Sequence, residues 1–257
     1  MLKIIVSPAK KMKHNDEVID WDQLPPLLDQ TRVLQAQLQR CTYAQLKDIW
    51  QCNDQIATLN EARLRNLSLT HRLTPAVLAY EGLQYQYMAP QVFDVAQWDY
   101  VRQHLVILSG FYGLLRATDG ITPYRLEMQA KLKVGASKNL YDFWKDTLYT
   151  ELVKDVSVVV NLASKEYSKT IERYVDDRVC FVTCTFAEWV KTNGEKKIKT
   201  KATAAKMARG EMVRFMAEHD VQDVERLKGF DRLGYAYSAA HSTKNQYVFL
   251  KHNEKEG

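Results

Sequence analysis

Residues 108–128 read LSGFYGLLRATDGITPYRLEM, and this stretch does more than any other to decide the fold. Three of the ten glycines of the chain fall in it, at Gly110, Gly113 and Gly120. Glycine accepts positive φ angles and lets another backbone come close, so this density predicts a tight structured turn or a loop that contacts a ligand. Polar side chains that suit ligand contact lie in the same stretch: Arg116, Tyr124, Arg125 and Glu127. The residues alone leave a purely structural turn open as the alternative.

Strand-like and helix-like patterns alternate along the chain without a repeat, a low-complexity tract or a flexible linker. Short β-branched runs predict buried strands, and apolar residues at helical spacing predict helices. Strands are expected at residues 2–7, 156–163, 179–186, 196–201 and 245–252, and helices within 27–66, at 139–153, after Ser164 and at 202–218. The sequence therefore predicts one compact mixed α/β (α+β) domain over residues 1–257, with a mixed sheet and flanking helices.

Composition excludes several classes of protein. Apolar residues make up 46% of 257 and charged residues 26%, as in an ordinary globular protein. No apolar run reaches the roughly 20 residues of a membrane span, and the first residues lack a signal-peptide layout, so a cytoplasmic protein with no membrane partner is expected. The histidines and cysteines show no metal-ligand spacing, so we expect no metal and no cofactor. Cys180 and Cys184 are expected to be buried on one face of a strand.

The helix expected at 202–218 has two chemically different sides. At about 100° per residue, Ala208, Met212, Phe215 and Met216 gather on one side and predict the core-facing stripe. Three basic residues, Lys206, Arg209 and Arg214, fall on the opposite arc around Gly210. A glycine at the centre of a basic face lets a phosphate backbone come close to the helix. A solvated basic face is the alternative.

Lysines alternate in the strand expected just before this helix. Lys197, Lys199 and Lys201 are spaced to share one face of that strand. A basic strand that leads into a basic helix forms a stripe able to neutralise several phosphates, with steep salt dependence. The stripe favours a polyanionic partner, although charged edge strands also protect against aggregation.

Polar residues follow two of the expected strands. Ser7 and Lys10 come after the first strand, and Asn161, Ser164 and Lys165 come at the end of the central one. Ligands of α/β sheets bind beyond the carboxyl ends of the strands, and helix N-termini attract anions. Together with Arg125 and Arg209, these residues predict one basic cleft. Familiar catalytic motifs are absent from the sequence, so catalytic residues stay unassigned; the candidates for proton transfer are Tyr124, Glu127, Glu166 and Lys10.

Several motifs along the chain resemble the YaaA family of peroxide-stress proteins. They are SPAK (7–10), AYEG (79–82), LSGFYGLLR (108–116), PYRLEM (123–128), LYDFW (140–144), VVNLASKEY (159–167) and KMARGEMVRF (206–215). The resemblance covers essentially the whole chain, because the motifs run in order from Ser7 to the C-terminal part. It implies a single domain with an unusual mixed α/β fold, a positively charged cleft, and a role in limiting iron-driven oxidative damage.

The resemblance also implies DNA binding through a helix–hairpin–helix-like element. On this chain the hairpin would be residues 108–113, with Gly110 and Gly113 exposing amides to a phosphate backbone without reading bases. Two residues separate these glycines where a typical hairpin has one, and Ala117 stands where many members of the family have proline.

Three hypotheses follow. The first is a sequence-nonspecific DNA-binding protein of the peroxide response; the alternative is an enzyme acting on a small anionic, nucleotide-like substrate in the same cleft. A third, direct iron handling, lacks a ligand pattern. The candidate DNA- or anion-binding residues are Lys10, Gly110, Gly113, Arg116, Arg125, Lys165, Lys197, Lys199, Lys201, Lys206, Arg209 and Arg214. The candidate pocket residues are Ser7, Tyr124, Glu127, Asn161 and Ser164. Convergence of Lys10, Arg125, Lys165 and Arg209 in a closed pocket would favour chemistry, and a long open groove would favour DNA.

Overall fold

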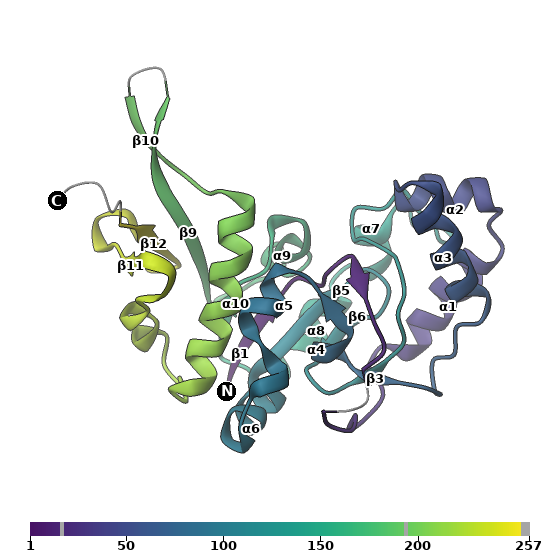
Figure 1. Ribbon diagram of the computed structural model, residues 1–257, viewed down its shortest axis with the longest axis horizontal. Helices are drawn as coiled ribbons and strands as arrows, with labels where there is room; N and C mark the ends of the chain where they lie inside the picture. Colours follow the sequence, from purple (N-terminus) through teal and green to yellow (C-terminus); the bar gives the residue numbers. More distant parts are fainter. Residues whose placement is uncertain (16–17, 193–194, 253–257) are drawn as a thin grey trace.

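Short apolar strands build the central sheet of the computed structural model, which describes residues 1–15, 18–192 and 195–252 (Figure 1). Its strand order is β11-β12-β9-β8-β1-β5-β6, and β10 pairs with β9. The parallel strands are β1 (Leu2–Val6), β5 (Leu105–Ser109), β8 (Val158–Asn161), β9 (Cys180–Thr192) and β12 (Gln246–Lys251). The antiparallel ones are β6 (Gly113–Arg116), β10 (Glu195–Lys199) and β11 (Tyr235–Tyr237). The predicted mixed α/β domain is confirmed.

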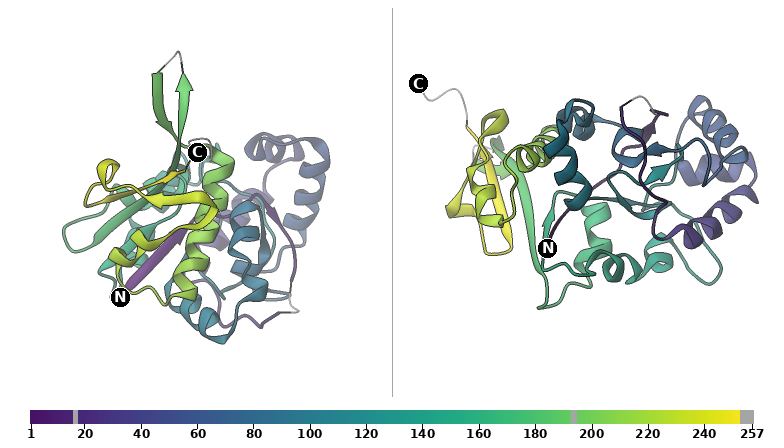
Figure 2. Two further views of the ribbon diagram at one scale, coloured as in Figure 1. Left: turned by 60° about the vertical axis from the view of Figure 1, so that its left-hand side comes forward. Right: turned by 90° about the horizontal axis from the view of Figure 1, so that it is seen from below.

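Helices cover both faces of this sheet (Figure 2). Helices α5 (Leu83–Met88), α6 (Val95–His104) and α10 (Ala202–Glu218) lie on one face. Helices α8 (Thr147–Leu152) and α9 (Lys165–Glu172) lie on the other, and α7 (Leu140–Trp144) precedes α8. Among the described residues, no helix combines the length and the apolar character that crossing a membrane requires.

The remaining elements are short. Two small two-stranded sheets pair β2 (Lys11–Met12) with β4 (Tyr80–Glu81), and β3 (Thr74–Pro75) with β7 (Gly120–Ile121). Helix α4 (Ala76–Ala79) lies between β3 and β4 along the chain. Short 3-10 helices occur at Pro90–Val92, Val224–Gly229, Arg232–Gly234 and Ala239–His241.

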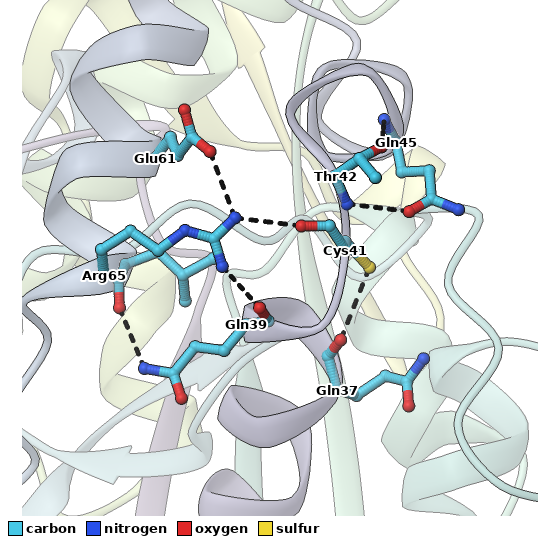
Figure 3. A network of polar contacts seen from close by, with 8 residues as sticks. Gln37, Gln39, Cys41, Thr42, Gln45, Glu61 and Arg65 are labelled. Carbon is cyan, nitrogen blue, oxygen red and sulfur yellow. Dashed lines mark hydrogen bonds and ion pairs between the residues drawn. The ribbon is translucent and has the colours of Figure 1, made fainter.

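Three helices fill the segment where two or three were expected: α1 (Leu28–Gln39), α2 (Tyr43–Trp50) and α3 (Asp54–Arg65). Thr42 and Gln45 form a capping box at the start of α2. The guanidinium of Arg65 donates to the carbonyls of Gln39 and Cys41 and pairs with Glu61 at 3.1 Å (Figure 3). A cation at the end of α1 satisfies carbonyls that have no partner within the helix, so this network joins α1 to α3.

Two local expectations were wrong. The single helix expected at 139–153 is broken into α7 and α8, because Lys145 ends α7 with a positive φ of 44°. Cys184 is buried as expected, but Cys180 is exposed. Cys180 is the first residue of β9 and pairs with Val158, which is itself only partly buried, so the covering layer does not reach this end of the strand.

The glycine-rich stretch is a β-hairpin rather than a helix–hairpin–helix element. It joins β5 to β6, and Gly113 has a φ of 76°. The Ser109 hydroxyl accepts hydrogen bonds from the backbone amides of Phe111 and Tyr112, at 3.1 and 2.9 Å. Gly110 is buried, and a Cβ built there would lie 2.6 Å from the carbonyl oxygen of Leu126. The amides of Phe111 and Tyr112 are therefore bonded within the turn and are not presented to a phosphate backbone.

Gly210 allows α10 to touch α5. A Cβ built on Gly210 would lie 2.1 Å from the Gln84 carbonyl oxygen, closer than any non-bonded contact permits. Gly210 therefore faces another helix, and the expectation that this glycine leaves room for a phosphate backbone was wrong.

The contact at Gly210 gives a stability prediction. Gly210→Ala should lower the free energy of unfolding by about 1–3 kcal/mol, because the added methyl overpacks the interface between α10 and α5. Gly229→Ala is the matched control, since a Cβ there meets nothing within 4 Å, and it should change stability by less than about 0.5 kcal/mol. Urea unfolding measures both; equal effects of the two substitutions would contradict the interpretation.

Candidate functional site

A pocket of about 380 Å³ lies where β1 and β8 end. Ser7 follows β1 and Ser164 follows β8, and these strands are parallel neighbours. The Ser164 amide donates to the Ser7 hydroxyl at 2.8 Å, and the two hydroxyls are 3.1 Å apart. The chain goes from β1 to β5 on one side and later returns to β8 on the other, so the strand order reverses here. Such a reversal at the carboxyl ends is where α/β sheets bind ligands.

Five chain segments line this pocket. They are residues 7–11, 81–85 and 124–127, the start of α9 with Ser164, Glu166 and Tyr167, and α10 with Lys206 and Arg209. Helix α5 is fixed to the end of β1, because the Tyr85 hydroxyl donates to the Ser7 carbonyl at 2.9 Å. Gly110 fits closely against the backbone of 126–128 and so helps to place the third segment.

Two arginines of the pocket carry charge without a partner. The Nε atoms of Arg125 and Arg209 are buried and have no hydrogen-bond partner among the described residues. Neither side chain has a carboxylate within 4.0 Å in the described part of the chain. Burial lowers the pKa of Arg209, with only Cys184 opposing it, but a guanidinium stays charged at any physiological pH. A buried charge without a partner lowers the stability of the fold, and an anion bound beside it would compensate this loss.

Carboxylates lie in the same pocket. Lys10 pairs with Glu127 at 2.8 Å, and Lys11 pairs with Glu81 at 3.1 Å. Glu166 accepts a hydrogen bond from the Gln129 amide at 3.3 Å, and no ion pair within 4.0 Å is found for it among the described residues. Burial raises the pKa of Glu166, and the nearby Glu127 raises it further, while Lys10 and Lys169 oppose the shift.

Tyr124 lines the pocket, but its hydroxyl is already engaged. It lies 2.8 Å from the Tyr80 hydroxyl and 2.6 Å from the Ser109 hydroxyl. Burial raises the pKa of Tyr124, so this group holds its proton at neutral pH. Its place in the hydrogen-bond network makes it a support of the pocket wall and a poor proton acceptor.

The structure brings together nine of the residues singled out in the sequence, including Glu166. Those that line the pocket are Ser7, Lys10, Tyr124, Arg125, Glu127, Ser164, Glu166, Lys206 and Arg209. Lys165 does not join them, since it is exposed at the first turn of α9 and does not line the pocket. Three of the four residues whose convergence was to separate chemistry from DNA binding therefore meet in one pocket.

The other candidate site residues lie outside the pocket, and several of them are bonded to protein groups. The buried Asn161 amide nitrogen donates to Glu172 and Thr183. Arg116 pairs with the fully buried Asp119 at 2.8 Å and also donates to the Leu24 carbonyl. Arg214 pairs with Glu218 at 2.7 Å. The pocket lining also lacks three lysines of β10 and the residues after it, Lys197, Lys199 and Lys201. It lacks Gly110 and Gly113 as well, which lie in the buried turn between β5 and β6.

Sequence reasoning did not name the five pocket residues of the segment 81–85 as site residues: Glu81, Gly82, Leu83, Gln84 and Tyr85. A signal for them was present, since AYEG was one of the family motifs and tyrosines gather around Gly82. Gln84 adds a third buried polar nitrogen without a partner among the described residues, its Nε2.

Fold and site together define an α/β protein with a charged pocket at the point where the strand order reverses. A family model described as "Peroxide stress protein YaaA" matches residues 2–241. The chain is 50% identical over 250 residues to a UPF0246 protein of Lachnoclostridium phytofermentans, covering 97% of this chain and 96% of that one. It is 49% identical over 254 residues to the UPF0246 protein of Lactiplantibacillus plantarum, covering 97% and 99%. The chain belongs to the YaaA family of peroxide stress proteins, which links it to the oxidative-stress response.

The unpaired charge of Arg209 gives a second prediction. Arg209→Met should raise the free energy of unfolding by about 1–3 kcal/mol, because it removes a buried donor that lacks a partner and keeps much of the volume. Arg214→Met on the same helix breaks an ion pair with Glu218 and should be neutral or destabilising by up to about 1 kcal/mol. Urea unfolding at pH 7 compares them; destabilisation by Arg209→Met would assign the guanidinium a structural role.

Proposed function

We propose that this protein acts in the peroxide-stress response by binding a small phosphate-bearing molecule in the pocket at the ends of β1 and β8. The observation that carries the proposal is the pair of buried Nε atoms of Arg125 and Arg209, which have no hydrogen-bond partner among the described residues. Guanidinium groups match phosphate oxygens with paired N–H donors. The volume of about 380 Å³ falls in the range of roughly 300–1,000 Å³ that is usual for small-ligand sites.

The lining of the pocket also favours a small molecule over a DNA strand. A groove for a phosphate backbone requires positive charge along its length, whereas this pocket mixes lysine, arginine, glutamate and tyrosine side chains. Mixed polar groups that converge on one volume are typical of a site that fixes the orientation of a ligand. Lys206 adds a further exposed cation at the rim.

Ribose 5-phosphate is a suitable probe of this proposal. Titration calorimetry should show that Arg209→Met raises its Kd at least tenfold, because a charge-assisted hydrogen bond to phosphate contributes about 1.5–3 kcal/mol. The control is Lys197→Met, whose ammonium pairs with Glu195 on β10 and which should leave the Kd unchanged. Equal affinities of the two variants would contradict the proposal.

DNA binding is the second candidate function, and a different surface supports it. Strands β9 and β10 form a two-stranded arm that projects from the body of the protein (Figure 1). Exposed lysines of this arm include Lys191, Lys197 and Lys199. A phosphate backbone would bind such an arm through charge alone and without sequence preference.

A mobility-shift titration on duplex DNA tests this second candidate. Charge reversal of Lys191, Lys197 and Lys199 to glutamate should weaken binding and reduce the slope of log K against log salt by about 3. Arg209→Met is the control, since it lies in the pocket and should leave DNA affinity unchanged. Undiminished binding by the triple variant would refute the involvement of the arm.

A further inference from the structure

The charges left unpaired in the pocket are of both signs. Arg125 and Arg209 present buried Nε atoms that have no partner among the described residues. Glu166 receives one backbone hydrogen bond, from Gln129 at 3.3 Å, while the neighbouring Glu127 is already neutralised by Lys10. A ligand that consists of phosphate alone would compensate the charge of the arginines and leave the carboxylate of Glu166 without an ion-pair partner.

The two kinds of charge come from different walls. Lys206 and Arg209 belong to α10, and Glu166 belongs to α9, which lies on the opposite face of the sheet (Figure 2). Their surroundings differ accordingly. The charged groups that act on Glu166 are Glu127, Lys10 and Lys169, whereas the group that acts on Arg209 is the thiol of Cys184 on β9.

We propose that the ligand is a phosphate monoester whose opposite end presents neighbouring N–H donors, with the phosphate held by Arg125 and Arg209 and the donors held by Glu166. This inference rests on the proposed function and deepens it by naming the substrate class. The ligand is thereby bound in one orientation between Arg209 on α10 and Glu166 on α9.

The donor requirement follows from the chemistry of a carboxylate. An ionised carboxylate only accepts hydrogen bonds, and its two oxygens suit two adjacent N–H groups. The guanine edge offers such a pair in its ring N–H and its exocyclic amino group. Adenine pairs an acceptor with a donor, and hypoxanthine lacks the amino group. Pro8, Leu83 and Leu126 also line the pocket and offer apolar surface that suits a flat ring.

Titration calorimetry with three matched nucleotides tests this inference on the full-length protein. Guanosine monophosphate should bind at least tenfold more tightly than inosine or adenosine monophosphate, since these lose one or both donors. Guanosine without its phosphate should bind at least tenfold more weakly than the monophosphate.

The isosteric variant Glu166→Gln supplies the second arm. It should reduce the preference for guanosine over inosine monophosphate to less than threefold, because an amide offers only one acceptor, and it should leave the Kd of ribose 5-phosphate unchanged. Glu172→Gln, on the same helix but outside the pocket lining, should keep the preference.

The outcomes separate the inference from the function on which it rests. Equal affinity for the three nucleotides and ribose 5-phosphate, all lost in Arg209→Met, overturns the inference and leaves the phosphate site standing. A preference that survives Glu166→Gln overturns the role of Glu166. No binding of any phosphate probe overturns both proposals.

Discussion

The contact between the backbone of Gly210 and the carbonyl of Gln84 determines the shape of the pocket. Because no side chain separates them, α10 and α5 meet at backbone distance, where a methyl group would lie 2.1 Å from the oxygen. Lys206 lies one turn before Gly210 on the same side of α10, and Arg209 directly precedes Gly210, so the close approach brings both to the pocket. On α5, the Tyr85 hydroxyl donates to the Ser7 carbonyl and joins this helix to the end of β1. One steric constraint thus fixes the position of the α10 side chains in the pocket and their distance from the end of β1.

Pairing of buried charge separates structural sites from the pocket in this protein. Asp119 is fully buried, and burial raises its pKa to about 7 although Arg116 opposes the shift. Protein groups compensate that charge, since the Arg116 side chain and amide both donate to the Asp119 carboxylate. The Nε of Arg209 has no such hydrogen-bond partner among the described residues. Buried polar groups are normally satisfied, and three that have no partner in the described part of the chain, on Gln84, Arg125 and Arg209, line the one pocket.

Sequence reasoning succeeded where periodicity and topology decide the result. Helix α10 was expected at 202–218 and occupies Ala202–Glu218, and Ser7 and Ser164 meet because parallel neighbouring strands end at one edge. It failed where packing decides. A helical wheel assigns Arg209 to an outer arc, because the wheel shows one apolar side and cannot show that α5 covers part of the other. The turn at Gly110 was taken to expose its amides, and only the structure shows the Ser109 hydroxyl accepting the two that follow it.

The two candidate anion sites differ in environment, and this difference determines how each responds to salt. Lysines of the β9–β10 arm are exposed, and Lys197 and Lys201 already have carboxylate partners at 2.9 and 2.6 Å. A phosphate backbone bound there displaces those partners as well as counter-ions, so its net gain is small and is screened within about 8 Å at physiological ionic strength. The arginines of the pocket are partly withdrawn from solvent and have no internal carboxylate to displace in the described residues, so an anion gains more from them and loses less to salt. Affinity that persists at high salt therefore belongs to the pocket, and affinity that falls steeply with salt belongs to the arm.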